Sequence, residues 1–268
     1  MPLKALLFDL DNTLVPEMAN YELAFSAACG EVARRHSFDL TEFRAAVFRS
    51  AEDLWRESET FDFCAMLGIG SPTSLLSEFP GERTEFALLR KWAPRYRERC
   101  WTDTLRLFVE DRLVRDLGAE LDTAFRAHQR THCPPYGDAI PMLQEVVRSF
   151  TLAVLTNGPD DVQRTKLRAA GLEPFFDVTI ASGEVGFGKP DPRIFTTALK
   201  RLGVHVDDAI AIGDSLERDV LGAHNAGLRC IWLNREGRAD PGRVIPDREI
   251  ASLTEVPAAI AALEACNL

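Results

Sequence analysis

Two carboxylates, Asp9 and Asp11, follow a short apolar run, Ala5–Phe8, near the N-terminus. A run of this length and composition predicts a buried β-strand, and Thr13 comes shortly after the second acid. In open α/β sheets the carboxyl ends of the strands face the crevice where ligands bind. Paired acids at this point therefore indicate a chemical site, although an Asp-Asn pair is also common in surface turns.

Later segments of the chain carry residues of the same chemical kind after other apolar runs. They are Thr156, Asn157 and Gly158, then Lys189 in a glycine-containing stretch, then Asp214 and Ser215, with Asp219 a little further on. Taken singly, each has an ordinary structural explanation, such as a turn, an exposed lysine or a helix cap. At successive strand ends of one parallel sheet, they are better explained as parts of one site.

The chemistry of this set points to phosphoryl transfer. Asp9, Asp11 and Asp214 cannot lie together without a counter-charge, because crowded like charges are costly. A hard divalent cation resolves this, and Mg²⁺ usually takes one or two carboxylates together with substrate phosphate and waters. Lys189 adds a second positive charge, and the Thr156 hydroxyl and the two amides after it can donate hydrogen bonds to a phosphate. A cation, a lysine and amide donors around a carboxylate nucleophile form a phosphoryl-transfer site.

The elements that must position these residues alternate along the chain. Strands are predicted at residues 5–8, 151–155, 176–180, 209–212 and 229–233, and helices at residues 138–148, 160–170, 192–202, 217–226 and 255–265. Strands that alternate with helices of about ten residues indicate βαβ units and a doubly wound parallel sheet, hence an α/β fold.

Residues 21–129 contain no convincing strand. Apolar residues recur at helical spacing in residues 21–35, from Thr41 onward, in residues 84–99 and in residues 103–129. Pro94 should kink or end the third of these helices, Gly118 is a candidate division of the fourth, and residues 71–81 are expected to form a loop. The sequence thus predicts an all-helical domain, residues 17–133, inserted into an α/β domain of residues 1–16 and 134–268.

Composition sets outer limits on function. Hydrophobic residues make up 46% and charged residues 27% of the 268 residues, which is close to the globular norm. The net charge of -10 gives no electrostatic footprint for nucleic acid. The six cysteines form no C-x-x-C pair, so no zinc clip or redox motif is indicated. Without a signal pattern or a membrane-length apolar run, a cytoplasmic protein with no membrane partner is expected.

The four polar segments resemble the four motifs of the haloacid dehalogenase (HAD) superfamily. The matching segments are Asp9-x-Asp11-x-Thr13, Thr156-Asn157-Gly158, Lys189-Pro190, and Gly213-Asp214-Ser215 with Asp219. Their order, strand-end placement and internal spacing are similar to those of the family. The helical block resembles, by position only, the cap that many members insert after the first strand. The resemblance implies a Rossmann-like HAD core with an inserted helical cap.

The resemblance also implies roles for single residues. Asp9 would be the nucleophile that forms an aspartyl-phosphate, and Asp11 the general acid and then the base. The Asp9 carboxylate, the backbone carbonyl of Asp11 and Asp214 would hold Mg²⁺. The phosphoryl group would be bound by Thr156, Lys189 and, through their backbone, Asn157 and Gly158. Supporting roles would fall to Thr13, Ser215 and Asp219.

The superfamily contains several reactions, and the residues separate some of them. Dehalogenases lack the second acid of the first motif, so Asp11 favours phosphate. Phosphonatases use a cap lysine, and the only lysine between Val15 and Cys133 is Lys91, whose context does not suggest that role. The expected function is therefore Mg²⁺-dependent hydrolysis of a phosphate monoester, with a small phosphorylated metabolite as partner.

Other readings stay open. A phosphomutase uses the same aspartates, and a phospho-ligand-binding or signalling protein would need no turnover. A receiver domain is far shorter than this chain and has no place for an insertion after the first strand. No G-x-x-x-x-G-K-[ST] segment is present, which disfavours a P-loop nucleotide site. The oligomeric state, monomer or homodimer, is left undecided.

Overall fold

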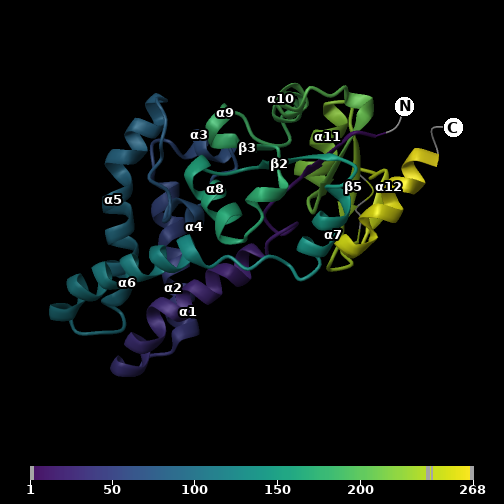
Figure 1. Ribbon diagram of the computed structural model, residues 1–268. Coiled ribbons are helices and arrows are strands. Elements are labelled where there is room, and N and C mark those ends of the chain that lie inside the picture. Colours follow the sequence, from purple (N-terminus) through teal and green to yellow (C-terminus); the bar gives the residue numbers. More distant parts are fainter. Residues whose placement is uncertain (1–2, 240–241, 243, 266–268) are drawn as a thin grey trace. The chain divides into compact units, whose positions relative to one another are not determined.

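The computed structural model describes residues 3–239, 242 and 244–265, so Cys266 lies outside the described residues. The chain forms two compact units (Figure 1). The α/β unit comprises Met1–Glu17, Pro134–Asn157 and Ala170–Leu268, and the helical unit comprises Met18–Cys133 and Gly158–Ala169. The predicted domains differ from these units mainly in residues 158–169, which the sequence assigned to the α/β part. The division into functional domains stays a prediction.

One six-stranded sheet forms the centre of the α/β unit. Its strands are β1 (Ala5–Phe8), β2 (Thr151–Thr156), β3 (Val178–Ala181), β4 (Ala209–Gly213), β5 (Arg229–Leu233) and β6 (Arg248–Ile250). Their order is β3-β2-β1-β4-β5-β6, and every pair is parallel. The doubly wound parallel sheet is therefore confirmed. The short strand β6 was not predicted, because two of its three residues are exposed and it contains no apolar run.

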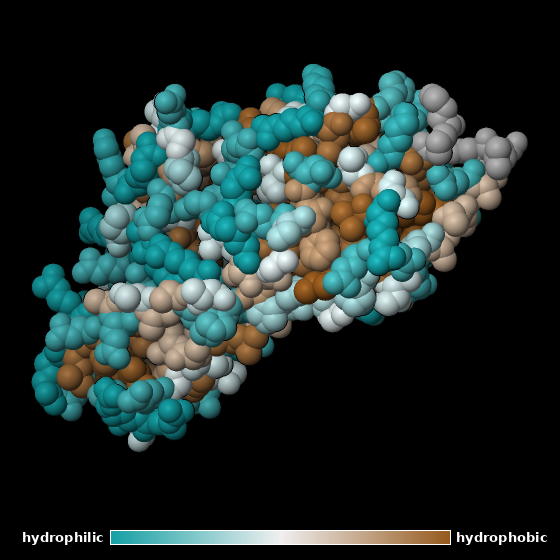
Figure 2. Space-filling view, in the orientation of Figure 1, coloured by the Kyte–Doolittle hydropathy of each residue, from teal (hydrophilic) through white to brown (hydrophobic). Residues whose placement is uncertain are grey.

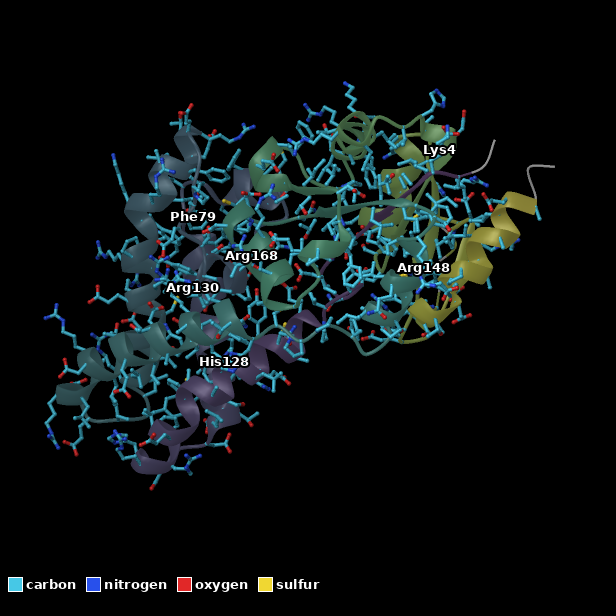
Figure 3. The ribbon with its side chains drawn as sticks, in the orientation of Figure 1. Lys4, Phe79, His128, Arg130, Arg148 and Arg168 are labelled. Carbon is cyan, nitrogen blue, oxygen red and sulfur yellow. The ribbon has the colours of Figure 1, made fainter. Side chains whose placement is uncertain are left out.

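The central strand β1 is apolar and fully buried, with a neighbouring strand on each side and helices on both faces of the sheet (Figure 1). Phe8 lies opposite Val154 of β2 and Ile212 of β4. At the other end of β1, Lys4 donates to Asp208 Oδ2 over 2.6 Å (Figure 3). This register brings the carboxyl ends of β1, β2 and β4 to the same level of the sheet.

Helices cover the two faces of this sheet (Figure 1). They are α7 (Ala139–Val146), α9 (Ser182–Val185), α10 (Pro192–Leu202), α11 (Leu221–Asn225) and α12 (Val256–Ala265). On one face Leu7 packs in a cluster with Ile194 and Phe195 of α10 and Ala223 of α11. Three-residue turns lie at Glu173–Phe175, Val206–Asp208 and Leu253–Glu255, and a π-helical turn, η3, lies at Leu216–Val220. The predicted helix at 217–226 is therefore split into η3 and α11.

The helical unit has seven helices among the described residues. They are α1 (Glu17–His36, which starts at the unit boundary), α2 (Leu40–Arg56), α3 (Phe61–Met66), α4 (Ser71–Ser74), α5 (Thr84–Leu105), α6 (Asp111–Thr131) and α8 (Asp160–Ala169). Its core is rich in aromatic rings. Phe25 stacks on Trp101 with ring centroids 5.9 Å apart, and Trp101 also meets Phe125 edge-on. Such aromatic pairs stabilise the core beyond what the burial of their apolar area alone provides.

Two helix limits differ from the prediction for identifiable reasons. Pro94 does not end α5, which continues to Leu105; the ring is solvent-exposed, so the carbonyl that loses its amide partner can be hydrated. Gly118 does not divide α6. A Cβ there would lie 3.1 Å from Thr102 Cγ2 of α5, so this glycine permits the close approach of α5 and α6.

The loop expected at residues 71–81 contains the single turn of α4 and is otherwise irregular. No helix among the described residues has the length and apolar character needed to cross a membrane. Large apolar side chains that are exposed, such as Leu107, Met66 and Ile245, are scattered along the chain. Hydrophilic side chains prevail over much of the face seen in Figure 2.

Candidate active site

Three of the four predicted acids meet at the carboxyl end of the sheet. Asp9 follows β1 directly, and its amide donates to Ile212 O of β4 over 2.9 Å. Asp214 follows β4, and Asp219 lies in the π-helical turn η3. Carboxylate oxygens of Asp9, Asp214 and Asp219 all lie within 4.8 Å of one another, and all three residues are buried. We call these three residues the acid cluster.

One cation lies inside the acid cluster. Lys189 Nζ is 2.6 Å from Asp9 Oδ1 and 2.6 Å from Asp219 Oδ1. The exposed fractions of the Lys189, Asp9 and Asp219 side chains are 3%, 9% and 5%. The three carboxylates and this buried ammonium carry a formal charge of −2 when all are ionised. Lys189 contacts two of the acids, and the third, Asp214, lies 3.4 Å from the half-exposed Arg238.

The pKa values report this imbalance. Burial, together with the charges of Asp219 and Asp214, raises the pKa of Asp9 to about 7, although Lys189 acts to lower it. Burial and the Asp219 charge likewise raise the pKa of Asp214. Burial acts to lower the pKa of Lys189, but Asp219 and Asp9 outweigh it and raise that pKa, so the lysine stays charged. The positive charges of the protein alone thus do not balance the negative charges of the acid cluster.

This donor set fits a hard divalent cation. Buried carboxylate oxygens are ligands that Mg²⁺ prefers, and its charge would offset the excess of −2. Asp219 already uses both oxygens, since Oδ1 accepts from Lys189 and Oδ2 accepts from the Ser215 amide over 3.0 Å. We therefore expect the direct carboxylate ligands to come from Asp9 and Asp214. The carboxylate of Asp11 is not part of the cluster.

A tight turn after β1 positions Asp11. The amides of Leu14 and Val15 both donate to Leu10 O, over 2.9 and 3.0 Å, and Asn12 has a positive φ of 64°. Asp11 is only partly buried in this turn, so its carboxyl can reach a group that enters from solvent. Thr13 is fully buried, and its hydroxyl has no hydrogen-bond partner. Thr13 therefore packs beneath the turn.

The side chain of Asn157 holds Lys189 through the lysine backbone. Asn157 Oδ1 accepts from Lys189 N over 2.8 Å, and Asn157 Nδ2 donates to Lys189 O over 2.9 Å. This double hydrogen bond fixes the segment that carries the ammonium group. The sequence predicted a phosphate contact through the Asn157 backbone, and the side-chain clamp is an additional function of this residue.

The other predicted residues lie at the same strand ends. Thr156 is the buried last residue of β2. Gly158, which begins the second segment of the helical unit, has a φ of 145°. Ser215 caps η3, since its hydroxyl accepts from Arg218 N over 3.2 Å. A Cβ at Gly213 would lie 2.3 Å from Asp219 Cγ, so this glycine makes room for the acid cluster.

Residues after β5 also reach this site, and the sequence reasoning missed them. Arg238 Nη2 lies 3.4 Å from Asp214 Oδ2. Arg235 pairs with both oxygens of Asp138, over 2.9 and 2.9 Å, and donates to Thr13 O over 3.3 Å. The rule that ligand sites lie at the carboxyl ends of parallel strands could have drawn attention to this loop, but exposed arginines are common and carry no motif.

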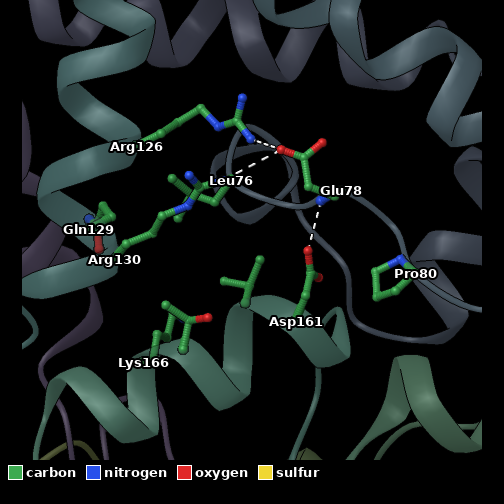
Figure 4. A pocket seen from close by; sticks show the side chains of 10 residues that line it. Leu76, Glu78, Pro80, Arg126, Gln129, Arg130, Asp161 and Lys166 are labelled. Atoms are coloured by element: carbon green, nitrogen blue, oxygen red, sulfur yellow. Dashed lines mark hydrogen bonds and ion pairs between the residues drawn. The ribbon is translucent and has the colours of Figure 1, made fainter.

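A separate cavity of about 260 Å³ lies in the helical unit (Figure 4). Its wall includes Arg126 and Arg130 of α6, Glu78 of the loop before α5, and Asp161 and Lys166 of α8. Asp161 is held by Ser77 Oγ and by the Glu78 amide, over 2.8 and 2.7 Å. None of the predicted site residues lines this cavity.

Comparison with known proteins identifies the family. Residues 3–227 match the family model of the haloacid dehalogenase-like hydrolases, so the chain belongs to this family and is a hydrolase. Over 255 residues it is 35% identical to the phosphoserine phosphatase of Thermus thermophilus, covering 95% of this chain and 98% of that protein. Over 264 residues it is 28% identical to the glyceraldehyde 3-phosphate phosphatase of Methanopyrus kandleri, covering 92% and 93%.

A solved structure shows the same fold. The putative HAD-hydrolase YfnB of Bacillus subtilis, described as bound to magnesium, superposes with a TM-score of 0.62. Its sequence is 22% identical, and the match covers 97% of this chain and 99% of YfnB. The solved structure supports the fold, and the family-model match over residues 3–227 confirms the superfamily resemblance inferred from the four motifs.

Proposed function

We propose that this hydrolase cleaves a small-molecule phosphate monoester, with Mg²⁺ bound and through an aspartyl-phosphate on Asp9. The observation that carries the proposal is the acid cluster, in which three buried carboxylates lie together with one buried cation, Lys189, which contacts Asp9 and Asp219. Two relatives that match nearly the whole chain are named phosphatases. Asp11 lies two residues after Asp9 and is partly exposed. Its carboxyl group can donate the proton that an alkoxide leaving group needs.

The first step is the transfer of the phosphoryl group to the protein. A carboxylate oxygen of Asp9 attacks phosphorus, the bond from phosphorus to the ester oxygen breaks, and Asp11 gives its proton to that oxygen. Lys189, already in contact with Asp9, favours the ionised nucleophile, because it acts to lower the pKa that burial raises. We assign phosphoryl binding to Lys189, the Thr156 hydroxyl and the amides of Asn157 and Gly158.

The second step returns Asp9 to its free form. Asp11, now a carboxylate, takes a proton from a water molecule whose oxygen attacks phosphorus. The bond from phosphorus to Asp9 breaks, and inorganic phosphate leaves. Asp11 is thereby protonated again, so one residue acts first as acid and then as base.

The metal would be held by the carboxylates of Asp9 and Asp214 and by the backbone carbonyl of Asp11. When bound, Mg²⁺ supplies charge that offsets the carboxylates and the phosphoryl oxygens. Asp219 would keep Lys189 in place, since it contacts the ammonium group directly. Ser215 would support Asp219 through its amide.

The cellular setting is proposed on chemical grounds. The five described cysteines are buried, and none of them forms a disulfide, which fits a reducing compartment such as the cytoplasm. The partner would be a small phosphorylated metabolite, as the names of the relatives suggest.

Phosphate release tests the proposal. A panel of small phosphate esters is assayed with Mg²⁺ and with excess chelator, for the wild type and for Asp9→Asn. Metal-dependent release that is lost in the variant supports it. Full activity in chelator would refute the metal assignment. A phosphomutase would convert one ester into its isomer without releasing phosphate, and a binding or signalling protein would do neither.

A further inference from the structure

Two asparagines at strand ends of the sheet hold cations in the same way. The side-chain amide of Asn157 clamps the backbone of Lys189, because it accepts from the Lys189 N–H and donates to the Lys189 carbonyl. Asn234, directly after β5, does the same to Arg238: Oδ1 accepts from Arg238 N over 2.8 Å, and Nδ2 donates to Arg238 O over 2.9 Å. The second clamp is itself anchored, since Asn234 N donates to Ile250 O over 2.8 Å. These hydrogen bonds therefore fix the backbone of the turn that carries Arg238.

The side chains of Lys189 and Arg238 differ in burial and in the length of their contacts with carboxylates. Lys189 is buried, with short contacts to two carboxylates. The side chain of Arg238 is 51% exposed, and its nearest contacts are longer: 3.4 Å to Asp214 Oδ2, 3.5 Å to Asp214 O and 3.5 Å to Glu236 Oε2. A guanidinium group has five N–H donors in a rigid fork. Most of the hydrogen-bonding capacity of Arg238 is therefore left for another group.

The position of Arg238 indicates which part of a substrate it meets. It touches the acid cluster at Asp214 and is otherwise open to solvent. The phosphoryl group must reach Asp9, which is buried, so the rest of the ester extends toward solvent. Planar, permanently charged guanidinium groups bind carboxylates through paired hydrogen bonds.

We propose that Arg238 forms a carboxylate subsite for the leaving group, so that the enzyme prefers phosphate monoesters whose alcohol bears a carboxylate. The inference rests on the proposed phosphatase function and deepens it by naming the substrate class. The sequence-similar relatives do not decide the matter, since one is named for phosphoserine and another for glyceraldehyde 3-phosphate, and only the first of these compounds has a carboxylate.

Matched pairs of esters test the subsite. O-Phosphoserine and O-phosphoethanolamine differ only in the carboxylate, as do 2-phosphoglycolate and methyl phosphate. With the wild type, kcat/KM should be higher for the acidic member of each pair. Arg238→Gln should lower kcat/KM for the acidic ester about 10- to 100-fold, the effect of losing a charged hydrogen-bonded pair. The neutral member should change by less than about 3-fold, because it makes no such bond.

Two further variants separate recognition of the ester carboxylate by Arg238 from a general effect of positive charge near the site. Arg218→Gln removes an exposed arginine that acts on Asp214 through its charge and has no contact with that carboxylate; it should leave the preference between the esters unchanged. Arg238→Lys keeps the charge but not the fork, and should restore only part of the preference. Equal losses on both members of each pair in Arg238→Gln would overturn the subsite and place Arg238 on the phosphoryl group.

A binding measurement keeps the inference testable without turnover. The Asp9→Asn enzyme is titrated calorimetrically with 2-phosphoglycolate and with methyl phosphate in the presence of Mg²⁺. Tighter binding of the acidic ester that disappears when Arg238→Gln is added supports the subsite. Equal binding of the two esters overturns it. Failure of the wild type to release phosphate from any ester would instead refute the proposed function, so the two failures are distinguishable.

Discussion

Two charge clusters of opposite composition occur in this protein, one in each unit. In the acid cluster of the α/β unit, three carboxylates lie around one buried cation, Lys189, which contacts two of them. In the helical unit the ratio is reversed, because the carboxylate of Glu78 is approached by Arg126, by Arg130 at 3.5 Å and by Arg97 at 3.6 Å. We call Glu78 and these three arginines the arginine cluster.

Burial makes the two clusters physically different. The side chains of Lys189 and Asp9 are 3% and 9% exposed. In the arginine cluster the side chains of Arg97 and Arg126 are also little exposed, at 9% and 15%, but those of Glu78, which carries the shared carboxylate, and Arg130 are 57% and 56% exposed. Water and salt reach the exposed carboxylate of Glu78, which the three arginines approach, and they screen the charges there. A buried excess has no such screening. In the acid cluster all three carboxylates and the cation between them are buried, so a further cation would offset more charge repulsion there than in the arginine cluster.

The largest effect should come from the nucleophile itself. Asp9→Asn removes the attacking oxygen, and turnover should fall by about 10³-fold or more, as for other covalent nucleophiles. Phosphate release at saturating Mg²⁺ measures it, and circular dichroism checks that the fold is intact. Asp207→Asn, at an exposed position, is the matched control and should keep full activity. Substantial residual turnover in Asp9→Asn would remove Asp9 from the role of nucleophile.

Removal of the buried cation should give the largest loss of stability. Lys189→Met leaves Asp9 and Asp219 without their shared partner, and breaking a buried pair costs about 3–5 kcal/mol. Urea unfolding in chelator measures the change in the free energy of unfolding. The control is Lys200→Met, because Lys200 is an exposed lysine on α10. A loss below about 1 kcal/mol would mean that the acids are protonated or solvated, and the contrast between the clusters would fail.

Much of the sheet and of the site could be predicted from sequence because the signals are local. Strand β1 is a pure apolar run, and Asp9 follows it directly. The parallel register then brings Asp9, Thr156 and Asp214 to one edge without further information. Strand β6 could not be predicted, since Arg248 and Glu249 are exposed and the strand forms only by pairing with β5.

Contacts between distant residues account for what the sequence did not reveal. Asn157 clamps the backbone of Lys189 across 32 positions, and no local pattern encodes that pairing. Arg238 reaches Asp214 only because Asn234 fixes the turn after β5. Gly118, which looked like a helix break, is explained by the proximity of Thr102 on another helix.

The pair of Asp138 and Arg235 is intermediate in burial, with side chains 15% and 20% exposed. Burial acts to raise the pKa of Asp138, but hydrogen bonds from Arg235 and Ser252 outweigh it and lower that pKa. The folded state thus stabilises the ionised form of Asp138 more than the unfolded chain does. The pair stabilises the fold above the ordinary pKa of 3.8, and this contribution is lost as the pH falls through the lowered value.

Arg235→Gln should therefore cost about 1–2 kcal/mol of unfolding free energy near neutral pH. The difference from the wild type should shrink as the pH drops below 3.8. Urea unfolding as a function of pH measures both, with Arg148→Gln as the control, because Arg148 is exposed (Figure 3). A difference that stays constant down to the lowest pH would show that Arg235 acts by packing on Tyr136, whose ring lies 3.9 Å away.

The smallest effect is expected in the arginine cluster, where Glu78→Gln removes the shared carboxylate. Because Glu78 is 57% exposed, water can replace it, and the loss should not exceed about 1 kcal/mol. Urea unfolding at low and high salt measures it, with Glu82→Gln, an exposed residue of the same loop, as the control. High salt should reduce the loss further, because salt screens the repulsion among the arginines. A salt-independent loss as large as that of Lys189→Met would show that the two clusters are energetically alike, and that burial does not decide which of them needs a ligand.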